Sequence, residues 1–203
     1  MPASVENKVK FGISNVVYAM VTEVSDAGVP TYGVWKSLPY AVSLTADVNS
    51  NTSSDYADNK LVFSYNSITG ATITLEVTHL IDDFKKDVLG WKATSDGGLI
   101  QPTDNIKPKI ALGFQIDGDA KKSKRWFFLC SVSDPAGDSA STNTDSVTFA
   151  HDTVTLTAYP VPIGNDEISY LKQTIRSGDT GYANACKVGS APSLPTIATG
   201  NGS

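Results

Sequence analysis

The chain has 203 residues, of which 40% are hydrophobic and 18% charged, so it can form one domain with a substantial core. Its net charge of −5 argues against binding to nucleic acid through the phosphates. No apolar run approaches the length of a membrane span, and no charged start followed by an apolar segment predicts export. Frequent Thr, Ser, Val, Gly and Asp predict a β-rich protein. The start, MPASVENKVK, is typical of a cytosolic protein.

The first predicted strands cover residues 9–13 and 16–23. The second is apolar on both faces, which is typical of a strand that is central in a sheet or covered by a partner chain. Val17, Ala19 and Val21 are therefore candidate contacts between subunits.

After a strand at residues 38–45, residues 46–60 form a polar stretch of fifteen residues with two apolar anchors. A loop of that length is uncommon inside a compact domain and is usually functional or mobile. The strand period returns at residues 61–65. We expect the loop to reach an adjacent subunit through Asn49, Asn51 and Tyr56.

Residues 71–77 alternate apolar and polar side chains and are followed by the one convincing helix signal. Asp82 and Asp83 can cap the helix start, and Gly90 stands where a left-handed C-cap residue is expected. Phe84 and Val88 are four residues apart and share the face that must be buried. The segment predicts a short helix that plugs against the sheets.

Residues 110–116 predict a strand, residues 117–125 a hairpin tip, and residues 126–132 the return strand. The return strand is apolar on both sides, which indicates burial on both faces or a subunit contact. Phe127 and Leu129 are the candidate contacts here.

The fold class that follows is mainly β: two packed antiparallel sheets, sandwich-like or barrel-like, with one short flanking helix and long loops. The second polar loop is predicted at residues 134–146, and the domain is expected to cover residues 1–160. Residues 161–203 carry few groups to bury and are predicted to be an extension that is mobile unless adjacent subunits order it. The two cysteines, Cys130 and Cys186, are expected to be reduced.

Four segments carry a resemblance in the right order and spacing. They are NKVKFGISNVVYA near the start, YADN after the long polar stretch, DDFKKDVLG in the predicted helix, and KPKIALGFQIDGDA before the aromatic return strand. Over roughly residues 7–160 the chain resembles the major tail protein (tail tube protein) family of long, non-contractile-tailed bacteriophages, the siphophages.

The resemblance implies a structural virion protein with a β-sandwich or barrel-like subunit. Six copies would close into a ring, and rings would stack into a tube around the tape-measure protein. The tube would also meet the tail terminator and distal tail proteins, and the genome would pass through its lumen without sequence-specific binding. The protein would assemble in the host cytoplasm and reside in the phage tail, with no membrane partner.

Single residues give little support to catalysis. Asp82 and Asp83 are adjacent and point apart, so capping is favoured over an acid–base pair. The Asp117-Gly118-Asp119 segment lacks the remaining calcium ligands and predicts a turn. His79 and His151 have no metal-ligand spacing, and neither a nucleophile elbow nor a phosphate-binding glycine loop is present.

We therefore expect no catalytic residue, metal or cofactor. Two alternatives to the tail tube stay open: a tube protein of a type VI or other phage-derived injection system, and a β-sandwich binding module or adhesin.

Overall fold

The computed structural model describes residues 11–118, 121–135, 150–164 and 168–197. It is mainly β with one short helix, which confirms the predicted fold class. Its elements are β1 (Ile13–Val24), β2 (Pro30–Tyr32), β3 (Lys36–Ser37), β4 (Ala41–Ala57), β5 (Lys60–Val77), α1 (Asp82–Asp87), β6 (Lys92–Ala93), β7 (Leu99–Ile100), β8 (Ile110–Ile116), β9 (Ser123–Val132), β10 (Asp152–Tyr159), β11 (Val161–Pro162), β12 (Ser169–Tyr170) and β13 (Lys172–Arg176).

Within the described residues, nine strands form one antiparallel sheet in the order β2-β1-β8-β9-β10-β5-β4, with β13 on β9 and β3 on β1. β11 pairs with β12, and β6 with β7, in two small sheets. β4 contacts β1 although the two strands are far apart in the hydrogen-bonded order. The large sheet therefore curls into a barrel-like body, and its inner face becomes a closed core.

The inner core is a cluster of buried side chains on the concave face of the sheet. It draws on β1, β5, β8, β9, β10 and the helix, so strands distant in sequence share it. Its largest fully buried members include Tyr18, Ile73, Leu75, Phe84, Leu112, Phe127 and Leu156. The alternation in residues 71–77 is explained by this core, because every second side chain points into it.

The helix is anchored to the inner core as the sequence predicted. Phe84 is 1% exposed and Val88 is fully buried, and the ring of Tyr18 meets Phe84 edge-on at 5.0 Å between centroids. The Tyr18 hydroxyl donates a hydrogen bond to Asp87 Oδ2 at 3.0 Å, and Lys36 Nζ lies 2.6 Å from the same oxygen. These contacts hold the helix against β1.

The sequence prediction is correct for the C-terminal end of the helix and wrong for its N-terminal end. Gly90 adopts a positive φ of 72°, the conformation expected after a helix. The predicted capping is wrong, because Ile81 occupies the N-cap position and makes no side-chain cap. Asp82 and Asp83 lie in the first turn, where their charge faces the positive end of the helix.

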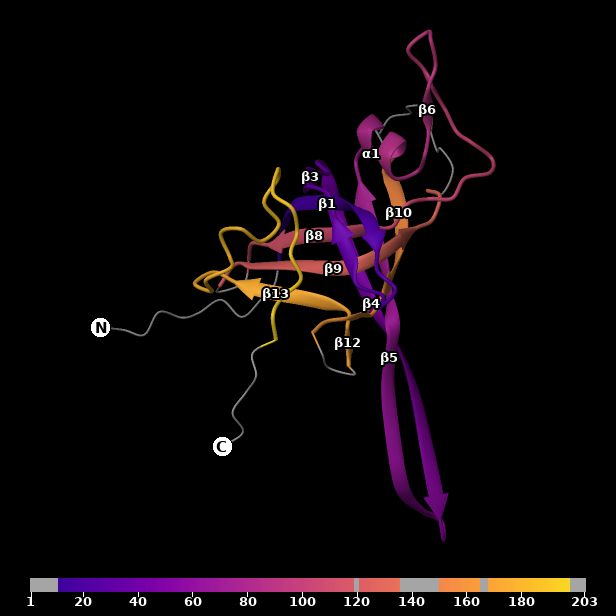
Figure 1. Cartoon of the computed structure of the whole chain (residues 1–203), viewed down its shortest axis with the longest axis vertical. Helices are drawn as coiled ribbons and strands as arrows, with labels where there is room; N and C mark the ends of the chain where they lie inside the picture. Colours follow the sequence, from indigo (N-terminus) through magenta and orange to yellow (C-terminus); the bar gives the residue numbers. More distant parts are fainter. Residues whose placement is uncertain (1–10, 119–120, 136–149, 165–167, 198–203) are drawn as a thin grey trace, which may run out of the picture.

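A second buried cluster, the outer core, covers the opposite face of β1, β8 and β9. Its members are Val17, Ala19, Trp35, Ala111, Trp126, Phe128, Leu129, Val161, Ile163 and Cys186. Figure 1 shows the C-terminal chain, in yellow, beside β8, β9 and β13. Leu194 and Ile197 pack on the outer core from this C-terminal chain.

The outer core corrects the prediction of a separate extension from residue 161. β13 is paired with β9 over Lys172–Arg176, and Cys186 is buried. The segment as far as residue 197 therefore belongs to the body of the subunit. Sequence composition missed this because a few apolar residues suffice to dock a polar segment on an existing apolar face.

Some strands are apolar on both faces, which the sequence explains either by burial within the subunit or by contact with another subunit. The structure decides between these two explanations. Val17, Ala19, Phe127 and Leu129 are buried within their own subunit. At most 7% of any of these side chains is exposed to a second copy, which corrects their assignment as subunit contacts. Val21 is partly buried against the outer core.

Smaller differences concern strand limits and the cysteines. β1 is one strand from Ile13 to Val24 rather than two segments, and residues 9 and 10 lie outside the described residues. Most of the polar loop predicted at residues 134–146 also lies outside them. Cys130 and Cys186 are free thiols in different cores, as the expected reduced state requires.

Candidate assembly surface

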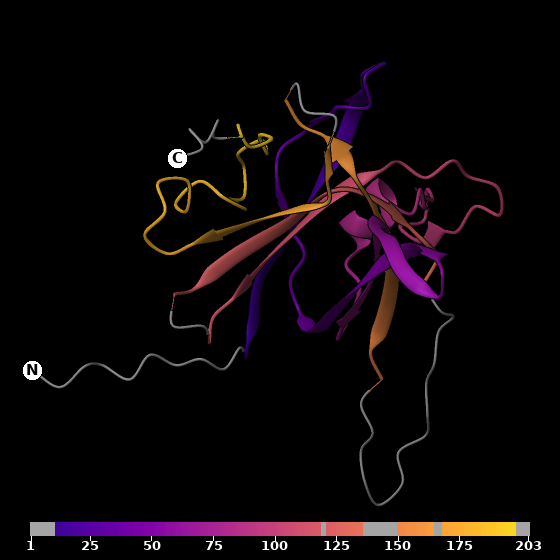
Figure 2. The ribbon, with the colours of Figure 1, turned by 90° about the horizontal axis from the view of Figure 1, so that it is seen from below.

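The stretch predicted as a long loop is a long β-hairpin. β4 and β5 pair from Ala41 with Val77 to Ala57 with Lys60, with three register shifts on the way, so residues 46–57 are strand and only the tip is turn. Figure 1 shows the hairpin extending far from the body, and Figure 2 looks along it from below. The loop prediction failed because Ser, Thr and Asn side chains carry no apolar alternation, whereas the strand is held by its backbone ladder.

The hairpin tip has a clear local cause. Asp58 and Asn59 both have positive φ, 51° and 60°. A two-residue turn with positive φ at both positions matches the right-handed twist of the flanking strands, and Asp and Asn tolerate it better than other non-glycine residues. The Asp58-Asn59 pair was the one sequence signal that could have identified the hairpin.

Only the base of the hairpin is part of the body. The last pair between β5 and β10 is Ala71 with Ala158. Beyond it, residues 50–68, here called the arm, form a two-stranded ribbon that protrudes by roughly 25 Å at 3.3 Å per residue. An isolated two-stranded ribbon is marginally stable in water, so an arm of this length needs a partner.

The arm is also the place where exposed apolar side chains concentrate. Tyr56, Leu61, Val62, Phe63, Tyr65 and Ile68 are each 54–66% exposed. An apolar patch of this kind on a soluble subunit indicates a contact with another protein. The arm is therefore the candidate assembly surface.

The three subunit contacts predicted in residues 46–60 lie at different positions along the hairpin. Asn49 stands at the base, where its amide donates to Thr72 Oγ1 at 3.2 Å. Asn51 and Tyr56 are on the arm, and the Tyr56 side chain is 66% exposed. Sequence reasoning missed the larger apolar residues of the return strand, Leu61, Phe63 and Tyr65, as contact candidates.

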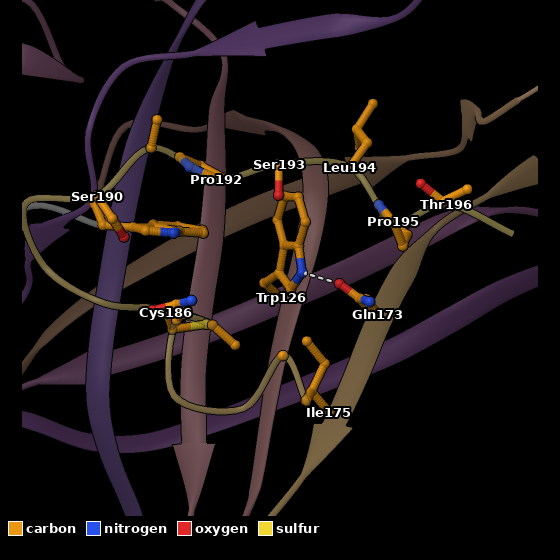
Figure 3. A pocket seen from close by; sticks show the side chains of 15 residues that line it. Trp126, Gln173, Ile175, Cys186, Ser190, Pro192, Ser193, Leu194, Pro195 and Thr196 are labelled. Carbon is orange, nitrogen blue, oxygen red and sulfur yellow. Dashed lines mark hydrogen bonds between the residues drawn. The ribbon is translucent and has the colours of Figure 1, made fainter. Parts of the chain in front are cut away.

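A pocket of about 400 Å³ lies between Trp126, Ile175 and the C-terminal chain (Figure 3). Trp126 Nε1 donates to Gln173 Oε1 at 2.8 Å across its wall. Among the described residues that line it, Cys186 is the only one with an ionisable side chain, and burial raises the pKa of that thiol to about 12. A thiol that stays protonated at neutral pH is a poor nucleophile.

Among the described residues, no group of three or more His, Cys, Asp or Glu side chains is placed to hold a metal ion. In the same part of the chain, no helix has the length and apolarity needed to span a membrane.

Comparison with known families agrees with this arrangement. The family model described as "Phage tail tube protein" matches residues 13–185. That range contains the large sheet, the helix and the whole hairpin. No individual curated protein matches the chain. The protein belongs to the phage tail tube family, whose members are structural proteins of the phage tail.

Proposed function

We propose that six copies of this subunit close into a ring and that stacked rings form a hollow tube around the tape-measure protein, through which the genome leaves the capsid. The tube would assemble in the host cytoplasm and end at the tail terminator and distal tail proteins. Membership of the phage tail tube family favours this function over a binding module or adhesin.

The observation that carries the proposal is the arm. Its apolar side chains are more than half exposed in the single subunit, whereas the body of the same chain is packed on both faces of β1, β8 and β9. An arm that docks on a different surface of the next copy makes a heterologous contact. Such contacts generate rings when the rotation closes and open filaments when it does not.

The charge of the chain suits a conduit. A wall that bound phosphate tightly would retain the DNA that it must release, and the net charge of −5 disfavours such binding.

The experiment is a matched pair of double variants followed by sedimentation of assembled material. Phe63→Ser with Tyr65→Ser removes two apolar side chains from the arm, which are 61% and 58% exposed. Ile106→Ser with Val188→Ser removes two exposed apolar side chains from elsewhere, 97% and 52% exposed. Both pairs should retain the wild-type melting temperature, because exposed positions contribute little to folding.

Only the arm variant should lose assembly. We expect the protein concentration at which it begins to sediment to rise at least tenfold, while the control pair assembles like wild type. Normal assembly by the arm variant would overturn the role given to the arm.

A further inference from the structure

The outer face of the large sheet is divided into two halves with opposite chemistry. Over β1, β8 and β9 it is apolar and covered by the outer core. Over β10, β5 and β4 it is uncovered and bears mainly hydroxyl side chains. The register places Thr155 opposite Thr74, and Thr74 opposite Thr45 on the next strand.

A similar row of opposed residues occurs two residues further along each strand. Thr157 lies opposite Thr72 and, on its other side, opposite Ser131 of β9. Thr74 and Thr45 are exposed, and Thr155, Thr157 and Thr72 are half-buried. Directly opposed residues of neighbouring strands share a face, so these hydroxyls form a continuous lattice across four strands. We call this surface the threonine face.

The charges on the threonine face are acidic. Asp47 lies opposite Thr72, and Glu76 lies opposite both Ser43 and Thr153. Ser43 Oγ donates to Glu76 Oε2 at 3.0 Å, and His151 Nδ1 lies 2.7 Å from Glu76 Oε1. No lysine or arginine belongs to the described residues of this lattice.

Basic side chains nearby are engaged elsewhere. Lys109 lies at the border of the face, with its ammonium 5.9 Å from the centre of the Tyr159 ring. Lys124, near the opposite end of β9, donates to the backbone carbonyls of Tyr182 and Ala185. Neither is aimed across the threonine face.

This composition is unlike that of a protein contact and unlike that of a DNA-binding surface. The centre of a protein interface is enriched in aromatic residues, Met and Arg. Among the described residues of the lattice there is no Met or Arg, and its one aromatic neighbour is Tyr159 at the border, whose hydroxyl shares a hydrogen bond with Ser131 Oγ at 3.2 Å. A surface that holds DNA presents Lys or Arg to the phosphates. A lattice of hydroxyls and carboxylates is well hydrated. It repels a polyanion weakly and offers no cationic group to bind its phosphates.

We infer that the threonine face lines the lumen of the tube and is the wall along which double-stranded DNA passes. This inference rests on the proposed tube. On this inference, the outer-core half of the sheet and the arm do not face the lumen.

The test is thiol labelling of two separate variants, Thr74→Cys and Thr155→Cys. The native Cys130 and Cys186 are buried and serve as the unreactive background. Each variant is treated with N-ethylmaleimide, which can diffuse along a lumen, and with a maleimide on a large polyethylene glycol, which cannot. Unassembled subunits and purified tubes are compared by mass shift.

In unassembled subunits both reagents should modify both thiols. In tubes we expect the small reagent to modify both positions and labelling by the large reagent to fall at least tenfold. Disassembly of the same tubes should restore labelling by the large reagent.

Other outcomes overturn the inference and separate it from the function. Protection from both reagents would place the face in a subunit contact, as would loss of assembly by both variants while wild type assembles. Undiminished labelling by the large reagent would place it on the outside of the tube. Absence of tubes from the wild-type protein would instead refute the proposed function itself.

Discussion

The two halves of strand β5 differ in their strand partners and in the burial of their apolar side chains. In the inner half, Ile73, Leu75 and Val77 are fully buried between β4 and β10. In the outer half, Leu61, Phe63 and Tyr65 pair only with β4 and are more than half exposed. The inner half is stabilised by the subunit's own core. The outer half is apolar without a core of its own, and in the proposed tube another copy would cover it.

The largest expected effect comes from the helix that closes the core at the inner half of β5. Phe84→Ala should lower the free energy of unfolding by about 3–5 kcal/mol, because a buried ring is removed and a cavity remains. Thermal denaturation of the unassembled subunit measures this loss. A melting temperature equal to that of wild type would show that the helix does not act as a plug.

A matched pair of leucines compares the two halves of β5 directly. Leu75 is fully buried and Leu61 is 56% exposed on the same strand. Leu75→Ala should cost about 2–5 kcal/mol of subunit stability. Leu61→Ala should change subunit stability by no more than about 0.5 kcal/mol but weaken assembly.

Both variants are examined by chemical denaturation and by sedimentation. If Leu61→Ala destabilised the unassembled subunit as much as Leu75→Ala, the arm would be packed on its own body, and the contrast between the two halves would disappear.

The inner half of β5 was predictable from sequence and the outer half was not. Residues 71–77 alternate because one face meets a core within the chain, and that period is visible in the residues themselves. Residues 46–57 pair with an apolar strand, yet most of their own side chains are polar and show no apolar alternation. Their strand conformation depends on the partner strand and on the Asp58-Asn59 turn.

The candidate subunit contacts also show how far prediction from the sequence can go. Val17 and Leu129 lie on strands with two apolar faces, and sequence alone could not tell a second core from a second subunit. The deciding residues, Cys186, Leu194 and Ile197, lie far along the chain in a segment whose composition gave no sign of a core.

An intermediate effect is expected at Gly70, where the arm leaves the body. A Cβ built on Gly70 would lie 2.5 Å from the carbonyl oxygen of Ala158 on β10. Gly70→Ala should therefore cost about 1–3 kcal/mol, because β5 must move away from β10. Hydrogen exchange at the amides of Ala71 and Ala158 should become faster.

The control for Gly70→Ala is Ser67→Ala, on the exposed arm beyond the junction, which should leave that exchange unchanged. Equal protection in Gly70→Ala and wild type would show that the close approach of the two strands is not needed.

The smallest expected effect depends on pH. The hydrogen bond with His151, and then that with Ser43, holds the pKa of the Glu76 carboxyl below its usual value of 4.5. A carboxyl with a lowered pKa stabilises the folded state above its unfolded pKa, and this contribution is lost as the pH falls through the folded pKa. Wild type should thus be slightly more stable than Glu76→Gln near neutral pH.

The difference in stability between wild type and Glu76→Gln should shrink as the pH falls below about 4.5. Melting temperatures across an acid series measure it. A difference that stays constant or grows at low pH would show that the charge of Glu76 is not what stabilises the end of β5.

The most direct measurement is negative-stain electron microscopy of the purified protein across a concentration series, alone and with the tape-measure partner. We predict hollow tubes of uniform diameter built from stacked six-fold rings, and for the Phe63→Ser and Tyr65→Ser double variant only separate subunits or unstacked rings. Separate wild-type subunits under every condition, with the partner present, would contradict the assembly proposed for this chain.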